Sequence, residues 1–568
     1  MKKLKRRYIF PACAVSGALT GMTVSYILPS GFEYFTMIPF FIVLLLVSEG
    51  ELPENHPVRG GHPVWGVISR GIFMGFSYFY PFYLVVWHWL LTMYPLDFTG
   101  MSSGAALAAI LIAWLGLPLL QTCVAMLWAP VCLFISRSTA SRGNSLGKRG
   151  LKLLFPLLSG CVYIFFEWTE TLTWAGVPWG RLAIGQAYTP IFIQSASLFG
   201  SYVISLVVVL VNAYIALGIL AFAHSEKKRA AISGGVAAAV FTSNLLVGAV
   251  ILAAREADEA EDAVTFAAIQ GNVSSREKWS EDWYFEDYAE LYSELSIEAA
   301  EAGADVILWT ETSLPYSINI HSYMTEYLEE LADECDAVLL ATAFWREVDE
   351  DGESITYNTV IKVTPDEGID TENIYFKRRL VPFGEFVPYE NLIKVIFPPL
   401  TELGMFGSSI TTGDEATIIP TEYGNIGALV CFDSIYENLA RSSVLAGAEI
   451  ITISTNDSWF GDSAALYQHT AQAILRAVEN DRWVVRAGNT GYTCVISPSG
   501  EIINDTEINE RTFIISEVYS RDTTTLYTAT GNILVFAAAL ASLAAVTDGC
   551  VRMRCELKER KNKSEETA

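Results

Sequence analysis

The stretch that decides the fold is Gly427-Ala428-Leu429-Val430-Cys431-Phe432-Asp433, in which small and apolar residues run directly into a thiol and a carboxylate. It predicts a buried β-strand that ends at a tight turn, because Glu437, Leu439 and Ala440 follow at helical spacing. A cysteine at such a junction lies near helix N-terminal amides, which favour a thiolate or an adjacent oxyanion. The thiol still needs a base or a cationic neighbour, since its free pKa is about 8.5. Taken alone, the stretch fits a buried structural cysteine better than a nucleophile.

Two further stretches end in groups that such a thiol could use. Trp309-Thr310-Glu311-Thr312-Ser313-Leu314-Pro315 closes another apolar run with a carboxylate ahead of a proline. Glutamate is almost never fully buried without a partner, so Glu311 is either a surface turn residue or a base. In Tyr375-Phe376-Lys377-Arg378-Arg379-Leu380-Val381-Pro382-Phe383-Gly384-Glu385, Glu385 follows Lys377 by eight positions. By itself this stretch is explained by a basic turn and a surface ion pair.

Around these stretches, short β-branched runs alternate with longer helical patterns from Val264 to Ile515. Such alternation is typical of an α/β domain whose strands are covered on both faces. The strands are expected at Val264–Ile269, Val306–Trp309, Ala337–Ala343, Thr359–Val363, Ile426–Val430 and Ile450–Ser454, and the helices at Asp282–Ala302, Tyr323–Cys335, Ile435–Ala446 and Ala464–Glu479.

The rest of the chain is dominated by apolar runs. Its 568 residues are 52% hydrophobic, with a mean hydropathy of +0.33, which excludes a single soluble domain. A helix needs about 20 residues to cross a bilayer. Eight transmembrane helices are expected, at Tyr8–Leu28, Tyr34–Val47, Gly71–Met93, Gly104–Ile135, Leu153–Trp174, Ile191–Phe222, Ala230–Ala253 and Leu526–Val546. The fourth and sixth runs are too long for one straight span, and Pro118 or Pro130 could kink the fourth.

The positive charges predict the orientation of these spans, because Lys and Arg accumulate in cytoplasmic loops. The links at 29–33, 94–103 and 175–190 carry almost none, Arg181 being the exception. Seven spans from a cytoplasmic start then place residues 254–525 on the outer face. The basic clusters are Lys2–Arg7, Arg137–Lys152, Lys227–Arg229 and Arg552–Lys563.

The first run also has the shape of a cleaved signal peptide, since the basic residues Lys2–Arg7 precede an apolar stretch. Six more spans follow, which favours a retained helix. Cys13 could suggest a lipoprotein signal, but it lies very near the start and follows Phe10-Pro11-Ala12. It is therefore interpreted as a cysteine of the membrane interior.

The charge of the chain is concentrated in the predicted outer domain. The formal net charge is −26, from 63 acidic and 37 basic side chains, and about 50 acids but only about 15 bases lie between Arg255 and Asp522. Such an acidic body argues against nucleic-acid binding, which needs a basic footprint. We therefore expect a membrane region at 1–254, an outer catalytic domain at 255–522, and a last span with a basic tail at 523–568.

The nine cysteines are scattered without CxxC or Cys/His ligand spacing. Neither a disulfide framework nor a zinc site is expected.

Together, Glu311, Lys377 and Cys431 resemble the Glu-Lys-Cys triad of the nitrilase superfamily. The surrounding motifs resemble its membrane-embedded branch, the apolipoprotein N-acyltransferases, over nearly the whole chain. These motifs are Gly176-Val177-Pro178-Trp179-Gly180, Gln270-Gly271-Asn272-Val273, Lys278-Trp279, Val381-Pro382-Phe383-Gly384-Glu385-Phe386-Val387-Pro388, Asn456-Asp457-Ser458-Trp459-Phe460-Gly461-Asp462, Gln468-His469, Arg476-Ala477-Val478-Glu479-Asn480 and Arg486-Ala487-Gly488-Asn489-Thr490-Gly491.

The resemblance implies an αββα sandwich for the outer domain, held by the membrane helices. It also implies an enzyme of the bacterial inner membrane, with its catalytic domain on the periplasmic face. This enzyme would move an acyl chain from a phospholipid to the N-terminal amine of a diacylglyceryl-apolipoprotein. No metal or cofactor is expected, because a thiol supplies the nucleophile and an ester is already activated; a monomer is expected.

The same resemblance assigns roles to residues. Cys431 would form a thioester with the acyl chain, and Glu311 would be the general base. Lys377 and the backbone N–H of Phe432 would hold the oxyanion. Glu385 would either orient Lys377 or help to deprotonate the incoming amine.

Four further positions belong to the predicted site or its surroundings. Trp279 is expected either to line the acyl site or to be a core tryptophan. The family usually has Tyr and Glu after the nucleophile, where this chain has Phe432 and Asp433, so the hydrogen bonds made there must be remade or lost. Glu170 stands where the family tends to have arginine.

Several interpretations remain open. His469 offers a Cys/His activation instead of the triad. The apolar stretch 392–406 is interpreted as a mobile arm that gates lipid entry, with a packed loop as the alternative. Glu167 and Glu170 are either functional groups at membrane depth or side chains that reach water.

Two other functions compete with the acyltransferase. In a membrane-tethered amidase or nitrilase, water would take the acyl group from Cys431. A transporter or lipid-binding scaffold with an inactive domain is disfavoured by span interiors with few charges and by the presence of all three triad residue types.

Overall fold

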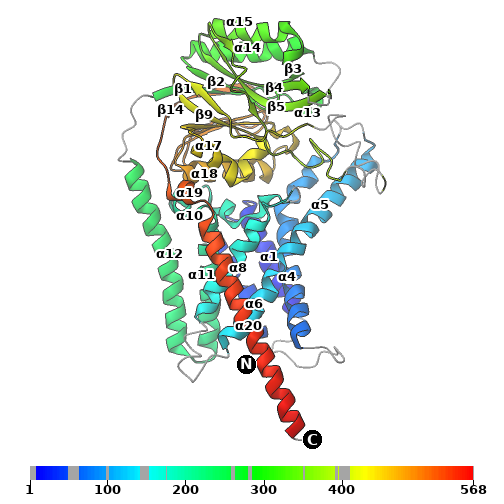
Figure 1. Cartoon of the computed structure of the whole chain (residues 1–568), viewed down its shortest axis with the longest axis vertical. Helices are drawn as coiled ribbons and strands as arrows, with labels where there is room; N and C mark the ends of the chain where they lie inside the picture. The colour runs from blue at the N-terminus through cyan, green and yellow to red at the C-terminus, as the bar shows by residue number, and fades with distance from the viewer. Residues whose placement is uncertain are drawn as a thin grey trace.

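The computed structural model describes residues 8–48, 63–96, 101–140, 153–173, 176–256, 263–278, 284–348, 354–389 and 410–566, together with Gly352 and Val395. They form a bundle of long helices and an α/β domain, stacked along the long axis of the molecule (Figure 1). The chain enters the α/β domain after helix α12 (Lys227–Glu256) and leaves it before α19 (Leu526–Thr530) and α20 (Ile533–Glu566). The α/β domain is therefore an insertion between two long helices.

The α/β domain contains two sheets. The first has eight strands in the order β14-β1-β2-β4-β5-β6, with β3 paired to β4 and β7 paired to β5. The second has six strands in the order β13-β12-β11-β10-β9-β8. The central strands β1, β2 and β4 are parallel, as are β9, β10 and β11, whereas the outer pairs are antiparallel. The strands are β1 (Ala263–Gln270), β2 (Val306–Leu308), β3 (Leu314–Ser317), β4 (Val338–Val348), β5 (Ser354–Thr364), β6 (Gly368–Ile369), β7 (Tyr375–Phe376), β8 (Ile418–Thr421), β9 (Gly424–Val430), β10 (Ile450–Thr455), β11 (Val484–Gly488), β12 (Cys494–Ile496), β13 (Ile502–Asp505) and β14 (Thr512–Tyr519).

Both faces of each sheet are covered. Leu308 and Leu340 from the first sheet share an apolar core with Val430 and Val485 from the second. Helices α14 (Phe285–Glu301) and α15 (Ser322–Cys335) pack on the outer face of the first sheet. Helices α17 (Glu437–Leu445) and α18 (Ala464–Asn480) pack on the outer face of the second, next to the bundle (Figure 1). The expected αββα sandwich is confirmed.

The bundle is built from apolar helices. In the described part of the chain, four helical stretches are long and apolar enough to cross a membrane: Ser103–Ser136, Tyr202–Ala223, Lys227–Arg255 and Ile533–Val551. The shorter apolar stretches Ile9–Val24, Glu33–Ser48 and Leu154–Thr169 lie among them. The chain is therefore a membrane protein. The bundle helices are α1 (Ile9–Val24), α3 (Ile38–Ser48), α4 (Pro63–Val86), α5 (Ser103–Ala125), α6 (Trp128–Ala140), α8 (Leu154–Thr169), α11 (Tyr202–Ala223), α12 and α20.

The two overlong runs are divided, as their length suggested. In the fourth, α5 ends at Ala125 and α6 begins at Trp128; Pro118 lies inside α5, and Pro130 lies in the first turn of α6, beside the break. The sixth run begins with α9 (Pro190–Ile193) and α10 (Ala196–Phe199), so only α11 is a long helix.

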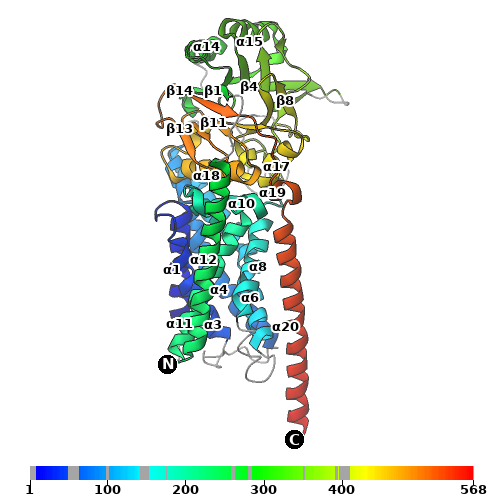
Figure 2. The ribbon, with the colours of Figure 1, turned by 90° about the vertical axis from the view of Figure 1, so that its left-hand side faces the viewer.

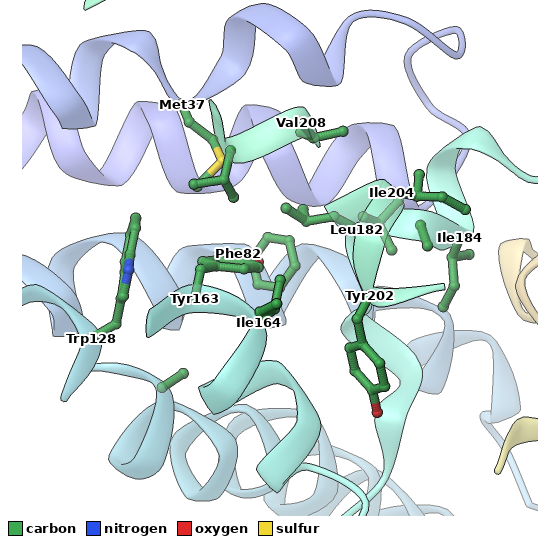
Figure 3. Packing of buried hydrophobic residues seen from close by; sticks show 14 of the residues in the cluster. Met37, Phe82, Trp128, Tyr163, Ile164, Leu182, Ile184, Tyr202, Ile204 and Val208 are labelled. Atoms are coloured by element: carbon green, nitrogen blue, oxygen red, sulfur yellow. The ribbon is translucent and has the colours of Figure 1, made fainter. Parts of the chain in front are cut away.

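Small residues and aromatic rings hold the bundle together. A Cβ atom at Gly17 of α1 would lie 1.9 Å from the main-chain oxygen of Tyr78, so only glycine permits this approach of α1 to α4. The rings of Trp128 and Tyr163 meet edge to face at 5.2 Å. Figure 3 shows both in one apolar interior with Phe82 of α4.

The α/β domain sits on the bundle through its lowest helical layer. Figure 2 shows α17 and α18 directly above the ends of the bundle helices. Tyr436, just before α17, donates a hydrogen bond of 2.9 Å to the main-chain oxygen of Gly176 in the loop after α8. The strand end that carries Cys431 therefore lies near the bundle.

Candidate active site

The three triad candidates lie at the ends of three strands. Glu311 follows β2, Lys377 follows β7 and Cys431 follows β9. The first two strands belong to one sheet and the third to the other, so the site lies between the sheets. Cys431 has a φ of +49°, in the left-handed region that few residues other than glycine adopt. The predicted tight turn after the strand is confirmed, and the nucleophile candidate sits on its strained residue.

Lys377 joins two carboxylates at the centre of the site. Its Nζ atom lies 2.7 Å from Oε1 of Glu311 and 2.8 Å from Oε1 of Glu385. The side chain is only 1% exposed. Burial acts to lower the pKa of Lys377, but the two carboxylates outweigh it and raise that pKa well above its usual range. Lys377 is therefore a permanent cation at neutral pH.

Both carboxylate oxygens of Glu311 are held in place. Asn358 donates to Oε1 at 2.9 Å, and the backbone N–H of Asn456 donates to Oε2 at 2.9 Å. The Lys278 Nζ atom donates to the main-chain oxygen of Glu311 at 2.8 Å. Burial lowers the pKa of Lys278 from 10.5 to about 7, so this side chain is not a fixed cation at neutral pH. The arrangement fixes the direction in which Glu311 can accept a proton.

These three supporting residues were not expected from the sequence as parts of the site. Lys278 and Asn456 belong to motifs quoted above, but the resemblance did not show which residues of those motifs contact Glu311. Asn358 lies within β5, just before the apolar run that predicted this strand, and is 1% exposed. A buried amide on such a strand needs hydrogen-bond partners, and this was the available signal.

Glu385 shares the Lys377 ammonium with Glu311. Its Oε2 atom accepts a 2.8 Å hydrogen bond from the backbone N–H of Val381, so both of its oxygens are engaged. Burial raises the pKa of Glu385, although Lys377 opposes this shift. Two carboxylates thus face one ammonium, and the cluster tends to retain a proton.

Cys431 is half-buried as a residue, and its thiol is neutral at rest. Burial raises its pKa well above the usual value, Glu311 adds to the shift and Lys377 opposes it. The charges of Glu311 and Lys377 thus both act on the sulfur. A neutral thiol beside a fixed carboxylate needs that carboxylate to take its proton before it can attack.

Phe432 and Asp433 follow in the short helix η8 (Cys431–Ile435). The Phe432 ring is 9% exposed and packs edge to face against Tyr436 at 5.6 Å. Asp433 is fully buried and accepts hydrogen bonds from the Tyr375 hydroxyl and from the backbone N–H of Arg379, both at 2.7 Å. The shorter carboxylate therefore ties the turn of Cys431 to the segment that carries Lys377.

His469 of α18 contacts the main chain of this turn. Its Nε2 atom lies 3.2 Å from the Cys431 main-chain oxygen and 3.0 Å from the Ser434 hydroxyl, and its Nδ1 atom lies 3.2 Å from Asp457. The Arg486 guanidinium holds the pKa of Asp457 well below its usual range, against the effect of burial. These contacts occupy both ring nitrogens, so they favour support of the turn over a Cys/His activation.

Glu167 and Glu170 do not reach water. They are 5% and 9% exposed, which makes the interpretation as water-reaching side chains wrong. One oxygen of Glu167 accepts the backbone N–H of Leu182 at 2.9 Å, and Glu170 accepts the hydroxyl of Tyr83. They hold the outer loop and α4 against α8.

Some predicted features lie outside the described residues. These are Trp279 and the apolar stretch 392–406 apart from Val395. Within the described ranges, no group of three or more His, Cys, Asp or Glu side chains is arranged to hold a metal ion.

Comparison with known proteins identifies relatives of both halves. The carbon-nitrogen hydrolase family model matches residues 265–527, and that of the apolipoprotein N-acyltransferase N-terminal domain matches residues 63–214. The apolipoprotein N-acyltransferase of Geobacter metallireducens is 32% identical over 69% of this chain and 73% of its own length. That of Gloeobacter violaceus is 31% identical over 81% of this chain and 82% of its own. Saccharomyces cerevisiae Nit3, a nitrilase-superfamily member of solved structure, is 18% identical, with a TM-score of 0.34 over 46% of this chain and 91% of its own.

Proposed function

Because the chain belongs to the apolipoprotein N-acyltransferase family, we propose that it transfers an acyl chain from a phospholipid to the N-terminal amine of a diacylglyceryl-apolipoprotein through a thioester on Cys431. The observation that carries the mechanism is the ammonium of Lys377, bound to Glu311 and Glu385 beside the turn of Cys431. The acyl chain leaves an ester oxygen and ends on an amine, and a thiol can carry it between these two groups as a covalent relay.

In the first half-reaction, Glu311 takes the thiol proton as the Cys431 sulfur attacks the ester carbonyl of the phospholipid. Lys377 and the backbone N–H of Phe432 stabilise the oxyanion of the tetrahedral intermediate. The carbon–oxygen bond then breaks, and Glu311 returns the proton to the leaving lysophospholipid. The acyl chain stays on the sulfur as a thioester.

In the second half-reaction, the acceptor amine attacks the thioester carbonyl at the same site. Glu311 takes a proton from the amine and gives it to the departing sulfur, which restores the Cys431 thiol. Glu385 keeps Lys377 in place throughout, because its two oxygens are already bound to Lys377 and to the Val381 backbone. The protonation state of the site after the cycle equals its state before.

The proposed setting is the bacterial inner membrane. Eight spans, with residues 255–522 inserted before the last one on the periplasmic face, are supported by the four long helices and by the basic cluster Lys227–Arg229, which begins α12 at the end of the bundle far from the α/β domain (Figure 1). The contact of the α17–α18 layer with the bundle supports an active site that opens at the bilayer surface. A single chain carries all the proposed site residues, which is consistent with a monomer.

A hydrolase of the amidase type is the second candidate, favoured by the carbon-nitrogen hydrolase match alone. It would use the same triad with water as the acyl acceptor. The match of the helical half and the relatives that extend over both halves favour the acyltransferase.

The test is intact-mass spectrometry of the purified protein after incubation with phospholipid. We expect an acyl adduct on Cys431 that a diacylglyceryl-peptide removes with formation of an acylated peptide. Cys431→Ala should lack the adduct, whereas Cys494→Ala, which removes a buried thiol of the same domain, should keep it. Release by water at the same rate without peptide would favour the hydrolase, and no adduct at all would contradict both.

A further inference from the structure

Arg181 is the one basic residue of the outer links, and the proposed reaction does not use it. It lies between the short helices η4 (Pro178–Gly180) and η5 (Leu182–Gln186), in the loop that faces the α/β domain. Its guanidinium forms an ion pair of 2.9 Å with Glu437 across the junction of the two halves. Arg181 and Glu437 are 0% and 2% exposed, so both charges are removed from water.

Glu437 accepts hydrogen bonds from several elements of the helical half. Its Oε2 atom accepts from Arg181, and its Oε1 atom accepts from the Tyr202 hydroxyl at 2.8 Å and from Asn532 at 3.3 Å. Arg181 also donates to the hydroxyls of Ser201 and Tyr202 at 3.1 Å, and it lies over the Tyr202 ring. One carboxylate thus fixes the outer loop, the start of α11 and the segment before α20 relative to one another.

Glu437 is also the first residue of α17, directly behind the nucleophile turn. Only Tyr436 separates it from the last residue of η8, the helix that begins with Cys431. Tyr436 donates to the main-chain oxygen of Gly176, and its ring packs against that of Phe432. A shift of Glu437 would therefore be transmitted over six residues to the thiol and to the proposed oxyanion donor.

A buried ion pair is a costly way to hold two surfaces together. Apolar residues of similar volume often stabilise such a site as well or better, whereas removal of one partner leaves an uncompensated charge. A charged pair does define a single geometry through directional hydrogen bonds, which apolar side chains do not. At this junction, the segment whose geometry the pair defines is the one between Glu437 and Cys431.

We propose that Arg181 is a positioning residue for acyl transfer: through Glu437 it holds the turn Cys431–Tyr436 so that the thiol and the Phe432 N–H meet the same carbonyl group. The proposal rests on the proposed function in that it assigns the turn to that reaction. Arg181 touches none of the reacting atoms. Its substitution should lower the rate of thioester formation and leave the KM for phospholipid nearly unchanged.

The experiment compares three variants of the full chain in detergent. Arg181→Met leaves Glu437 unpaired, and Arg181→Met/Glu437→Met removes both charges. Arg255→Met is the matched control, because it breaks the Arg255–Asp481 ion pair, also 2.9 Å, at the same junction but away from the nucleophile turn. For each variant, the rate of thioester formation per folded molecule, the KM for phospholipid and the melting temperature are measured.

Arg181→Met should form the thioester about 10- to 100-fold more slowly, the size of effect that a displacement of about 1 Å can cause. The double variant should regain the melting temperature but not the rate. Arg255→Met should melt earlier and keep its rate within about twofold, because no reacting group moves. A double variant with the wild-type rate, or a control slowed as much as Arg181→Met, would overturn the proposal. If Arg181→Met does not fold, Arg181→Lys replaces it, with the same criteria.

Alkylation of Cys431 by iodoacetamide separates this proposal from the proposed function. The reaction needs no lipid, and the Cys431 peptide is followed by mass spectrometry. Arg181→Met should change the alkylation rate of Cys431 at least about fivefold, while Arg255→Met should not. A wild-type protein that forms no thioester would contradict the proposed function, yet an altered alkylation rate would still support positioning by Arg181. Equal alkylation rates in all variants would count against positioning.

Discussion

The molecule contains two buried charged clusters with opposite charge balance. At the candidate active site, the Lys377 ammonium is shared by Glu311 and Glu385, so carboxylates outnumber the cation. At the junction of the two halves, Arg181 and Glu437 are paired one to one. Burial raises the pKa of Glu385 in the first cluster. In the second, burial acts to raise the pKa of Glu437, but Arg181 and then Arg476 outweigh it and lower that pKa from 4.5 to about 2.

The difference separates proton transfer from positioning. A cluster with one carboxylate in excess contains a carboxyl group of raised pKa, which can exchange a proton with a thiol or an amine. A balanced pair is fully ionised at neutral pH and can only fix geometry. Four substitutions test this distinction: two in the active-site cluster, one in the junction pair and one on the turn between them.

Lys377→Met should have the largest effect. It leaves the carboxylates of Glu311 and Glu385 facing each other without a cation, so one of them must take up a proton, and an oxyanion donor is lost. Thioester formation should fall by at least about 10³-fold, which corresponds to about 4 kcal/mol. The rate of acyl-adduct formation on Cys431, followed by intact mass, measures this.

Lys362→Met is the control for this substitution. Lys362 lies on β5 in the same sheet and forms an ion pair of 2.9 Å with Asp370, away from the site. Its loss should leave the rate within about twofold, since partly exposed ion pairs contribute little. A Lys377→Met variant that kept more than a tenth of the wild-type rate would show that the ammonium is not an essential part of the site.

Glu311 and Cys431 could be singled out because each follows an apolar run, whereas Lys377 and the triad as a whole were predicted from the resemblance to the nitrilase superfamily. An ionisable group that ends a buried run is conspicuous in the sequence, as Glu311 and Cys431 are. The same apolar runs predicted the strands β1, β2, β4, β5, β9 and β10, which are all confirmed. Strands β11 to β14 were not predicted: β11 and β12 are buried but short, whereas β13 and β14 are half-buried and contain polar residues such as Asn504.

The balanced pair could not be predicted in the same way. Arg181 and Glu437 are 256 positions apart, and each alone looks like an ordinary loop or helix-start residue. Pairing of this kind depends on how the helical half docks on the sandwich, which no local pattern encodes. The contacts of Asn358 and Lys278 with Glu311 were missed for the same reason.

Glu437→Gln should have the next largest effect, which is on the pH dependence of the free energy of unfolding. The Glu437 carboxyl has a lowered pKa, so its contribution is complete above pH 4.5 and is lost as the pH falls towards 2. A shift from 4.5 to about 2 corresponds to about 3 kcal/mol of the free energy of unfolding. The wild type should therefore lose stability between pH 4.5 and 2 more steeply than Glu437→Gln.

Thermal unfolding in detergent at several pH values measures this difference. The variant should be less stable than the wild type at neutral pH, because Arg181 remains buried without its counter-ion. The two curves should run parallel between pH 5 and 7, where the Glu437 carboxyl is ionised in the folded and unfolded states. If the stabilities of the two proteins changed in parallel down to pH 2, the Arg181–Glu437 pair would not control the ionisation of the Glu437 carboxyl.

Glu385→Gln should have a smaller effect and decides between the two roles left open for Glu385. The amide keeps the shape but no longer shares the Lys377 charge. Because both Glu385 oxygens are already engaged, we expect a role in orienting Lys377, so both half-reactions should slow by about tenfold, or 1.4 kcal/mol. Single-turnover measurements of thioester formation and of its release by a diacylglyceryl-peptide test this. A variant that slowed only the release would instead assign Glu385 to deprotonation of the amine.

Phe432→Tyr should have the smallest effect, although Phe432 lies at the boundary between the two clusters. Its backbone N–H is the proposed oxyanion donor of the first cluster. Its ring packs on Tyr436, next to Glu437 of the second cluster. The family usually has tyrosine here, so the substitution restores a hydroxyl and leaves the N–H unchanged. With the ring 9% exposed, the hydroxyl can gain at most an ordinary hydrogen bond of about 1 kcal/mol. Thioester formation should therefore change by less than about fivefold. A larger gain would mean that the missing hydroxyl, rather than the backbone donor, limits the rate, and that the turn is tuned by its side chain as well as by Arg181 and Glu437.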